Sequence, residues 1–93
     1  MRTFRRHLAE ELADQEFRRL YEEEQRLAEL SVKIHRARED RGWTQKETAA
    51  RAQITQQQMS KIENGVNCNV ITLLKVCQAL GLKLDLETEE QAV

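Results

Sequence analysis

The sequence predicts an all-α fold, with a helical arm at the N-terminus and one short strand near the C-terminus. The chain contains no proline and only four aromatic residues, which is typical of an almost wholly helical protein. Apolar residues recur at three- and four-residue spacing along most of its length. Ninety-three residues with 40% hydrophobic content suffice for one small domain with a compact core and an appended arm.

Residues 1–29 are expected to form the arm, an amphipathic helical segment. Three apolar residues repeat every four positions near its start: Phe4, Leu8 and Leu12. Asp14 can cap a following helix, in which Phe17, Leu20 and Tyr21 continue the helical spacing. The run 22–26 contains no apolar residue, so we expect a break or an exposed bend there.

Residues 30–81 are expected to form the globular domain, whose first helix covers residues 30–41 and ends at Gly42. Two short helices should follow, because Thr44 precedes Glu47 by three residues and Thr55 precedes Gln58 by three. Each pair is a capping box, in which the two residues satisfy one another's unpaired backbone N–H groups.

The second of these helices has a hydrophobic staple at its start. Ile54 lies just before the Thr55 cap, and Met59 lies at the fourth helical position. Burial of Met59 and Ile62 leaves one polar stripe facing outward, consisting of Gln56, Gln57, Ser60, Lys61 and Asn64.

A last helix is predicted over residues 70–80, with Asn69 as its cap and Gly81 at its end. Residues 82–87 then alternate between apolar and polar, which indicates a strand. A single strand has no partner in this chain, so it must lie alone, pair with its copy in a dimer, or extend the sheet of another protein. The candidate dimerisation residues are Leu82, Leu84 and Leu86.

The net charge of −1 conceals an uneven distribution. Residues 1–30 carry 6 basic and 8 acidic side chains, residues 31–81 carry 8 and 4, and residues 82–93 carry 1 and 4. A basic middle suits contact with phosphates, and acidic ends suit a basic partner, although ordinary solvated faces would have the same composition. No apolar run is long enough to span a membrane and no signal peptide opens the chain, so we expect a cytoplasmic protein.

Neither a metal site, a cofactor nor a catalytic centre is expected. Cys68 and Cys77, with His7 and His35, show no zinc-ligand spacing, and a disulfide is not expected in the cytoplasm. Cys77 falls in an apolar helical run and should be buried. No nucleophile lies at useful spacing from a base, so an enzyme is the least favoured class.

Two short capped helices around a tight turn are the arrangement of a helix-turn-helix, in which the start of the second helix enters the major groove of DNA. Gln56 and Gln57 lie there, and a glutamine amide matches the donor and acceptor edge of adenine. Lys61 can reach a guanine edge or a phosphate. A face of this composition could also be merely solvated.

The remaining candidate DNA contacts have lesser roles. Gln45 opens the first helix of the pair, where free backbone N–H groups favour a phosphate. Gln58 turns back to cap its helix together with Thr55, and is the weaker candidate for base contact. Lys46 and Asn64 are further phosphate candidates.

The segment TQKETAARAQITQQQMSKIENG, followed by NVITLLKVCQALG, resembles the XRE (Cro/C1-type) helix-turn-helix family over about residues 31–81. The resemblance implies a five-helix DNA-binding domain that contacts phosphate through Gln45 and base edges or backbone through Gln56, Gln57 and Lys61. Two positions depart from the family pattern. Gln53 replaces the usual turn glycine and must adopt a positive φ or alter the turn, and Thr48 replaces a large aliphatic residue.

The flanking segments are similar to HigA-type antitoxins of type II toxin–antitoxin systems. That resemblance implies a dimer that represses its own operon and neutralises a basic RelE/HigB-like toxin, which cleaves mRNA. The arm residues that would bind this toxin are Phe4, Leu8, Leu12, Phe17, Leu20 and Tyr21. The same residues would equally suit a helical hairpin packed on the protein's own core or on its dimer mate.

Two other functions are compatible with the sequence. The chain could be a stand-alone repressor of the XRE type, with the N-terminal helices serving dimerisation. It could also be a module that bridges proteins without reading DNA.

Overall fold

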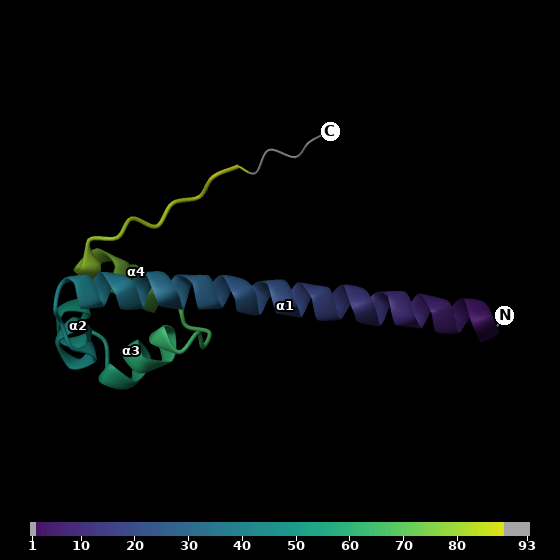
Figure 1. Ribbon diagram of the computed structural model, residues 1–93, viewed down its shortest axis with the longest axis horizontal. Helices are drawn as coiled ribbons and strands as arrows, with labels where there is room; N and C mark the ends of the chain where they lie inside the picture. Colours follow the sequence, from purple (N-terminus) through teal and green to yellow (C-terminus); the bar gives the residue numbers. More distant parts are fainter. Residues whose placement is uncertain (1, 89–93) are drawn as a thin grey trace.

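The computed structural model describes residues 2–88 and contains one very long helix with three short helices gathered at its C-terminal end (Figure 1). Helix α1 spans Arg2–Asp40, α2 spans Gln45–Ala52, α3 spans Gln56–Glu63 and α4 spans Val70–Leu80. At 1.5 Å per residue the 39 residues of α1 extend for about 58 Å, which accounts for the 60 Å length of the molecule.

The core lies where the last two turns of α1 meet the three short helices. Ile34 of α1 contributes to it, α3 contributes Met59 and Ile62, and α4 contributes Val76 and Leu80. Ala49 and Ala52 complete it from α2, with Trp43, Ile54 and Leu82 packed at its margins. Apolar positions at helical spacing on four helices thus converge on one small core, which holds α2 and α3 in place.

The ends of the short helices are fixed by the residues that the sequence indicates. Thr44 Oγ1 accepts a hydrogen bond from the Glu47 N–H, and Asn69 Oδ1 accepts one from the Ile71 N–H. Gly42 and Gly81 follow α1 and α4 with φ of 68° and 70°, a left-handed conformation that favours glycine. These predictions are confirmed.

The predicted break at residues 22–26 is wrong. Helix α1 runs without interruption through this segment, so the arm and the first helix of the domain are one helix. The segment is rich in glutamate with glutamine and arginine, which are good helix formers, and it lacks the glycine or proline that would end a helix. The absence of apolar residues predicts exposure, and exposure alone does not interrupt a helix.

The side chains of residues 3–26 are all exposed, and this part of α1 projects away from the other helices (Figure 1). An N-terminal hairpin packed on the protein's own core is therefore excluded. We refer below to residues 3–26 of α1 as the arm. The predicted boundary between an arm of residues 1–29 and a globular domain of residues 30–81 stays a prediction.

The predicted C-terminal strand is also wrong, as is the count of five helices. Within residues 2–88 the structure has four helices and no strand, and residues 82–88 form an extended segment (Figure 1). Residues 82–87 have strand-like alternation, but a strand requires a hydrogen-bonded neighbour, and none of the described segments pairs with them. Residues 89–93 lie outside the described part of the chain.

Cys77 is buried in the core, as predicted, and Cys68 lies half-buried in the loop before α4. Both thiols are free, and burial raises the pKa of each. Within residues 2–88 no helix combines the length and the apolar character that crossing a membrane requires.

Candidate nucleic-acid interface

The turn between α2 and α3 is tight because Gln53 adopts a left-handed conformation. Its φ of 58° and ψ of 44° make it the one non-glycine residue with positive φ among the described residues. The Gln53 N–H donates to the Ala50 carbonyl at 3.2 Å, and the Ile54 N–H donates to the Ala49 carbonyl at 3.0 Å. Of the two outcomes expected for Gln53, the structure has the positive φ rather than an altered turn.

The start of α3 is fixed by a complete capping box. The Gln58 N–H donates to Thr55 Oγ1 at 3.0 Å, and the Thr55 N–H donates to Gln58 Oε1 at 2.9 Å. At the start of α2 the Glu47 side chain forms no such return bond to Thr44, so the capping box predicted for Thr44 and Glu47 is wrong in this half, and only the bond to Thr44 Oγ1 is present. The amide of Gln58 is thus partly occupied by the cap, which leaves Gln56 and Gln57 as the free amides of the first turn.

The polar stripe predicted on α3 faces solvent. Gln57, Lys61 and Asn64 follow one another at four- and three-residue spacing and are exposed, and Gln56 is exposed beside them. Ser60 is half-buried, and the Asn64 amide lies 3.5 Å from its hydroxyl. The exposed face therefore begins with two glutamine amides and carries one cation a turn later.

The N-terminus of α2 supplies the second part of the interface. Gln45 is its first residue and is half-buried, whereas Lys46 is exposed. The first N–H groups of a helix lack intrahelical acceptors and favour an anion. This end of α2 can therefore receive a phosphate, with the Gln45 amide and the Lys46 ammonium beside it.

Thr48 fills the space between α2 and the core without leaving a polar group unpaired. It is fully buried, and its hydroxyl donates to the Thr44 carbonyl at 2.9 Å. A back-bond of this kind satisfies the hydroxyl within its own helix. The departure from an aliphatic residue at this position is thereby accommodated.

Helix α3 is held in place by its buried face and by one carboxylate at its C-terminal end. The side chain of Glu63 is only 3% exposed and accepts two hydrogen bonds from Arg38, at 2.8 and 2.9 Å. His35 Nδ1 lies 2.6 Å from the same carboxylate, and the other ring nitrogen lies 2.8 Å from Glu39. This cluster ties the end of the exposed α3 face to α1.

The charges of this cluster stabilise one another. Burial alone would raise the pKa of Glu63, but the hydrogen bonds from Arg38 and His35 and the electrostatic attraction of these two residues together outweigh burial and hold that pKa below its usual range. The hydrogen bond to Glu63 raises the pKa of Arg38 further above its ordinary value. Glu63 is therefore ionised near neutral pH and can act as a permanent anchor for α3.

Arg38 also fixes the loop that leads into α2. Its guanidinium donates to the Trp43 carbonyl at 2.8 Å, and the Arg51 guanidinium stacks on the Trp43 ring with 4.2 Å to the ring centroid. The segment before the Thr44 cap is thus held from both sides. Arg38 therefore connects the segment before α2 to the C-terminal end of α3.

Sequence reasoning missed the three residues that anchor α3: His35, Arg38 and Glu63. A signal for Glu63 was present, since it follows the two buried residues of α3 on the same inward side. A carboxylate among apolar residues on a helix face requires a cationic partner. The sequence does not indicate that Arg38, 25 residues earlier, is that partner.

The other predicted site residues lie away from the helix pair. The six arm residues proposed for toxin binding are all exposed, and none of them contacts the core. In the extended segment after α4, Leu82 packs on the core, Leu84 is half-exposed and Leu86 is 95% exposed. No group of three or more His, Cys, Asp or Glu within the described residues could hold a metal ion.

Comparisons with known proteins agree with this geometry. The family model HTH_3, described as helix-turn-helix, matches residues 34–86. A solved structure titled "MDT Protein" is 31% identical with a TM-score of 0.63, and the match covers 69% of this chain and 92% of that chain. No curated protein matches this chain. The HTH_3 match begins after the arm.

Proposed function

Because the chain belongs to the helix-turn-helix family HTH_3 and is a DNA-binding regulator of the XRE type, we propose that it represses its own operon and serves as an antitoxin. The first part of the proposal concerns which DNA it reads. The observation that supports it best is the exposed start of α3, where Gln56 and Gln57 are free of capping bonds. Two adjacent amides at a helix start can each pair with an adenine edge in the major groove.

The proposed DNA contacts divide by chemistry. Gln56 and Gln57 read base edges, and Lys61 reads a guanine edge or binds a phosphate. Gln45 and Lys46 bind phosphate at the start of α2, and Asn64 and Ser60 lie at the edge of the contact. Thr55 and Gln58 act mainly by holding the first turn of α3 in register.

A module with so few base contacts gains affinity by binding as a two-fold dimer to half-sites about 34–36 Å apart. We propose that Leu84 and Leu86 of the extended segment, with Leu82 at its base, meet their copies in that dimer. Their exposure in a single chain supports this role, as do the exposed Ile71 and Leu74 on the neighbouring α4. Leu84→Glu with Leu86→Glu should yield a monomer by sedimentation equilibrium, whereas an unchanged dimer would contradict this interface.

The antitoxin part of the proposal rests on the arm. It carries six large exposed apolar side chains and no intramolecular partner among the described residues, which is typical of a surface that another protein covers. The partner we propose is a basic RelE/HigB-like toxin. Such a complex forms in the cytoplasm, where operator DNA and mRNA are both present.

A growth assay joined to a DNA-binding assay tests both parts. The basic product of a neighbouring gene should arrest growth when expressed alone, and co-expression of this chain should restore growth. The purified chain should shift DNA taken from directly upstream of its own gene. Operator binding without restored growth would indicate a stand-alone repressor. Restored growth without operator binding would indicate a module that binds only proteins.

A further inference from the structure

The helix face that holds α3 continues along α1 into the arm. Residues spaced alternately by three and four lie in one line along a helix. One such line, which we call the seam, contains Phe17, Tyr21, Glu24, Ala28, Ser31, His35 and Arg38.

The C-terminal half of the seam is covered by the protein itself. Arg38 and His35 bind Glu63 at the end of α3. Next along the seam, a Cβ on Gly65 would lie 3.8 Å from Ser31 Oγ and 3.9 Å from Ala28 Cα, so the loop after α3 passes directly against the helix. The part of the seam that α3 and the following loop cover therefore ends at Ala28.

The N-terminal half of the seam is uncovered. Phe17 is 71% exposed and Tyr21 is 55% exposed. Where the seam leaves the domain, a pocket opens between α1 and the loop after α3. Its lining includes Glu24, Leu27, Asn64, Gly65 and Asn67. Two exposed aromatic side chains and then Glu24 thus lead along the arm to a corner beside Asn64, the last residue of the exposed α3 stripe.

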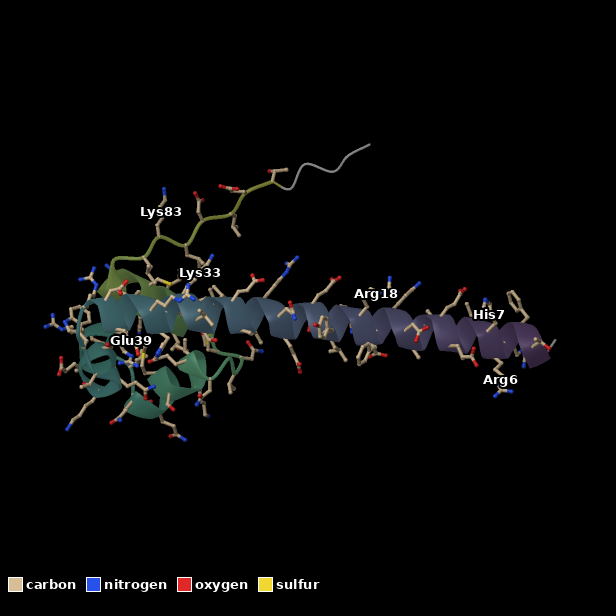
Figure 2. The ribbon with its side chains drawn as sticks, in the orientation of Figure 1. Arg6, His7, Arg18, Lys33, Glu39 and Lys83 are labelled. Atoms are coloured by element: carbon tan, nitrogen blue, oxygen red, sulfur yellow. The ribbon has the colours of Figure 1, made fainter. Side chains whose placement is uncertain are left out.

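Carboxylates outnumber cations beside these two aromatic residues, although Arg18 lies three residues before Tyr21. Asp14 and Glu10 precede Phe17 at the same three- and four-residue spacing, and Glu24 follows Tyr21. Asp14 and Glu24 form no salt bridge with any described residue, and Glu10 has only an exposed pair with Arg6 at 3.6 Å. Arg18 points to the side of α1 opposite α2 and α3 (Figure 2). Two aromatic residues are therefore bracketed by carboxylates.

The tip of the arm presents a different face. With 100° of rotation per residue, Phe4, Leu8 and Leu12 lie about 140–180° around the helix from Phe17. One partner helix lying on the seam cannot also cover these three residues. Leu20 lies between the two groups, about 60° from Phe17 and about 80° from Leu12, so the six apolar residues of the arm do not form one face.

We propose that Phe17 and Tyr21 of the seam, the carboxylates of Glu10, Asp14 and Glu24, and the corner at Asn64–Asn67 form one groove for a basic amphipathic helix of another protein. This inference rests on the proposed antitoxin function and assigns the toxin-binding surface to one face of the arm. A second copy of the arm does not fit the groove, because antiparallel pairing of Phe17 with Tyr21 would set Asp14 against Glu24. DNA does not fit either, because the carboxylates would repel phosphates.

The test uses the full chain and two synthetic helical peptides with the same heptad leucines. One peptide carries lysine at its polar positions and the other carries glutamate. We expect the lysine peptide to bind at least about tenfold more tightly by isothermal titration calorimetry, and to weaken with added salt. Equal binding of the two peptides, or binding of neither, would overturn the proposal.

Matched variants then locate the binding face. Phe17→Ser with Tyr21→Ser should weaken binding of the lysine peptide by about tenfold or more, whereas Phe4→Ser with Leu8→Ser should change it less than about twofold. Asp14→Lys with Glu24→Lys should reverse the preference in favour of the glutamate peptide. Equal losses of affinity from the first two variants would contradict this location of the binding face. So would an Asp14→Lys, Glu24→Lys variant that still prefers the lysine peptide.

Two controls separate the alternatives. Sedimentation equilibrium of the unbound wild-type chain and of the Phe17→Ser, Tyr21→Ser variant should give the same oligomeric state; a change would make a second copy the occupant and would overturn the proposal. Unchanged circular dichroism and operator binding would show that the variants fold. If the chain binds the lysine peptide more tightly but does not restore growth, the proposed antitoxin function is wrong and the proposed groove is still supported.

Discussion

The two ends of α1 have similar helical geometry and opposite surroundings. At its C-terminal end, Ile34 is buried and each polar group that faces α3 has a partner. In the arm every side chain from residue 3 to residue 26 is exposed, and its ion pairs link residues three or four apart. The domain is stabilised by tertiary packing, whereas the isolated arm depends on helix propensity and local pairs, which are individually weak.

The sharpest way to expose this difference is to remove matched amounts of apolar side chain from each end. Met59→Ala should destabilise the domain by about 2–5 kcal/mol, because Met59 is fully buried. Leu12→Ala should change stability by less than about 0.5 kcal/mol. Urea denaturation followed by the fluorescence of Trp43, the single tryptophan, measures the domain alone. Equal effects at the two sites would mean that the arm packs on the domain.

The next largest effect should come from the carboxylate that anchors α3. Glu63→Gln should cost up to about 3 kcal/mol near neutral pH, since it leaves Arg38 with an incomplete partner in a largely buried position. Glu22→Gln in the arm serves as the control and should be close to neutral. A Glu63→Gln variant as stable as wild type would contradict the anchoring role.

Glu63 should also make the stability of the domain depend on pH. Its pKa is lowered in the folded state, so its contribution is complete above the usual carboxyl range and is lost as the pH falls through the folded pKa. Glu63→Gln should flatten that acid decline in a plot of unfolding free energy against pH. An unchanged decline would assign the acid sensitivity to other carboxylates.

A change at the start of α3 should affect DNA binding without affecting stability. Gln56→Ala should weaken binding to the operator by about 1–3 kcal/mol and relax selectivity at one base pair. Gln25→Ala is the same change placed in the arm and should leave operator binding unaltered. Fluorescence anisotropy with a set of single-base operator variants provides the measurement, and unchanged selectivity would remove Gln56 from direct readout.

The smallest expected effect concerns the turn. Gln53→Gly should stabilise the domain by about 0.5–1 kcal/mol, because glycine adopts a positive φ without a steric penalty. Gln53→Ala keeps the penalty and should be neutral or slightly destabilising. Loss of stability in the glycine variant would mean that the Gln53 side chain makes a compensating interaction.

The features that could be predicted from the sequence are those that depend on neighbouring residues. The caps at Thr44, Thr55 and Asn69 and the glycines at 42 and 81 fix helix ends through local hydrogen bonds and φ preferences, and each is present. The outward side of α3 followed from the spacing of Met59 and Ile62. Features of this kind depend on only a few consecutive residues, so the sequence is sufficient to predict them.

The features that could not be predicted depend on distant partners. The alternation over residues 82–87 was interpreted as a strand, although strand formation requires a neighbour that the described chain does not supply. The bend predicted at residues 22–26 is a different case, because its error is local: the run consists of good helix formers, and exposure alone does not interrupt a helix. The pairing of Glu63 with Arg38 joins α3 to α1 across 25 residues and is visible only in the fold.

We propose that α2 and α3 read DNA, while the arm stays free for another protein. Hydrogen–deuterium exchange of the full chain, alone and with DNA from directly upstream of its gene, tests this claim most directly. We expect slower exchange in residues 45–65 on adding DNA and unchanged exchange in residues 3–26. Protection of the arm by DNA, with residues 45–65 unaffected, would contradict it.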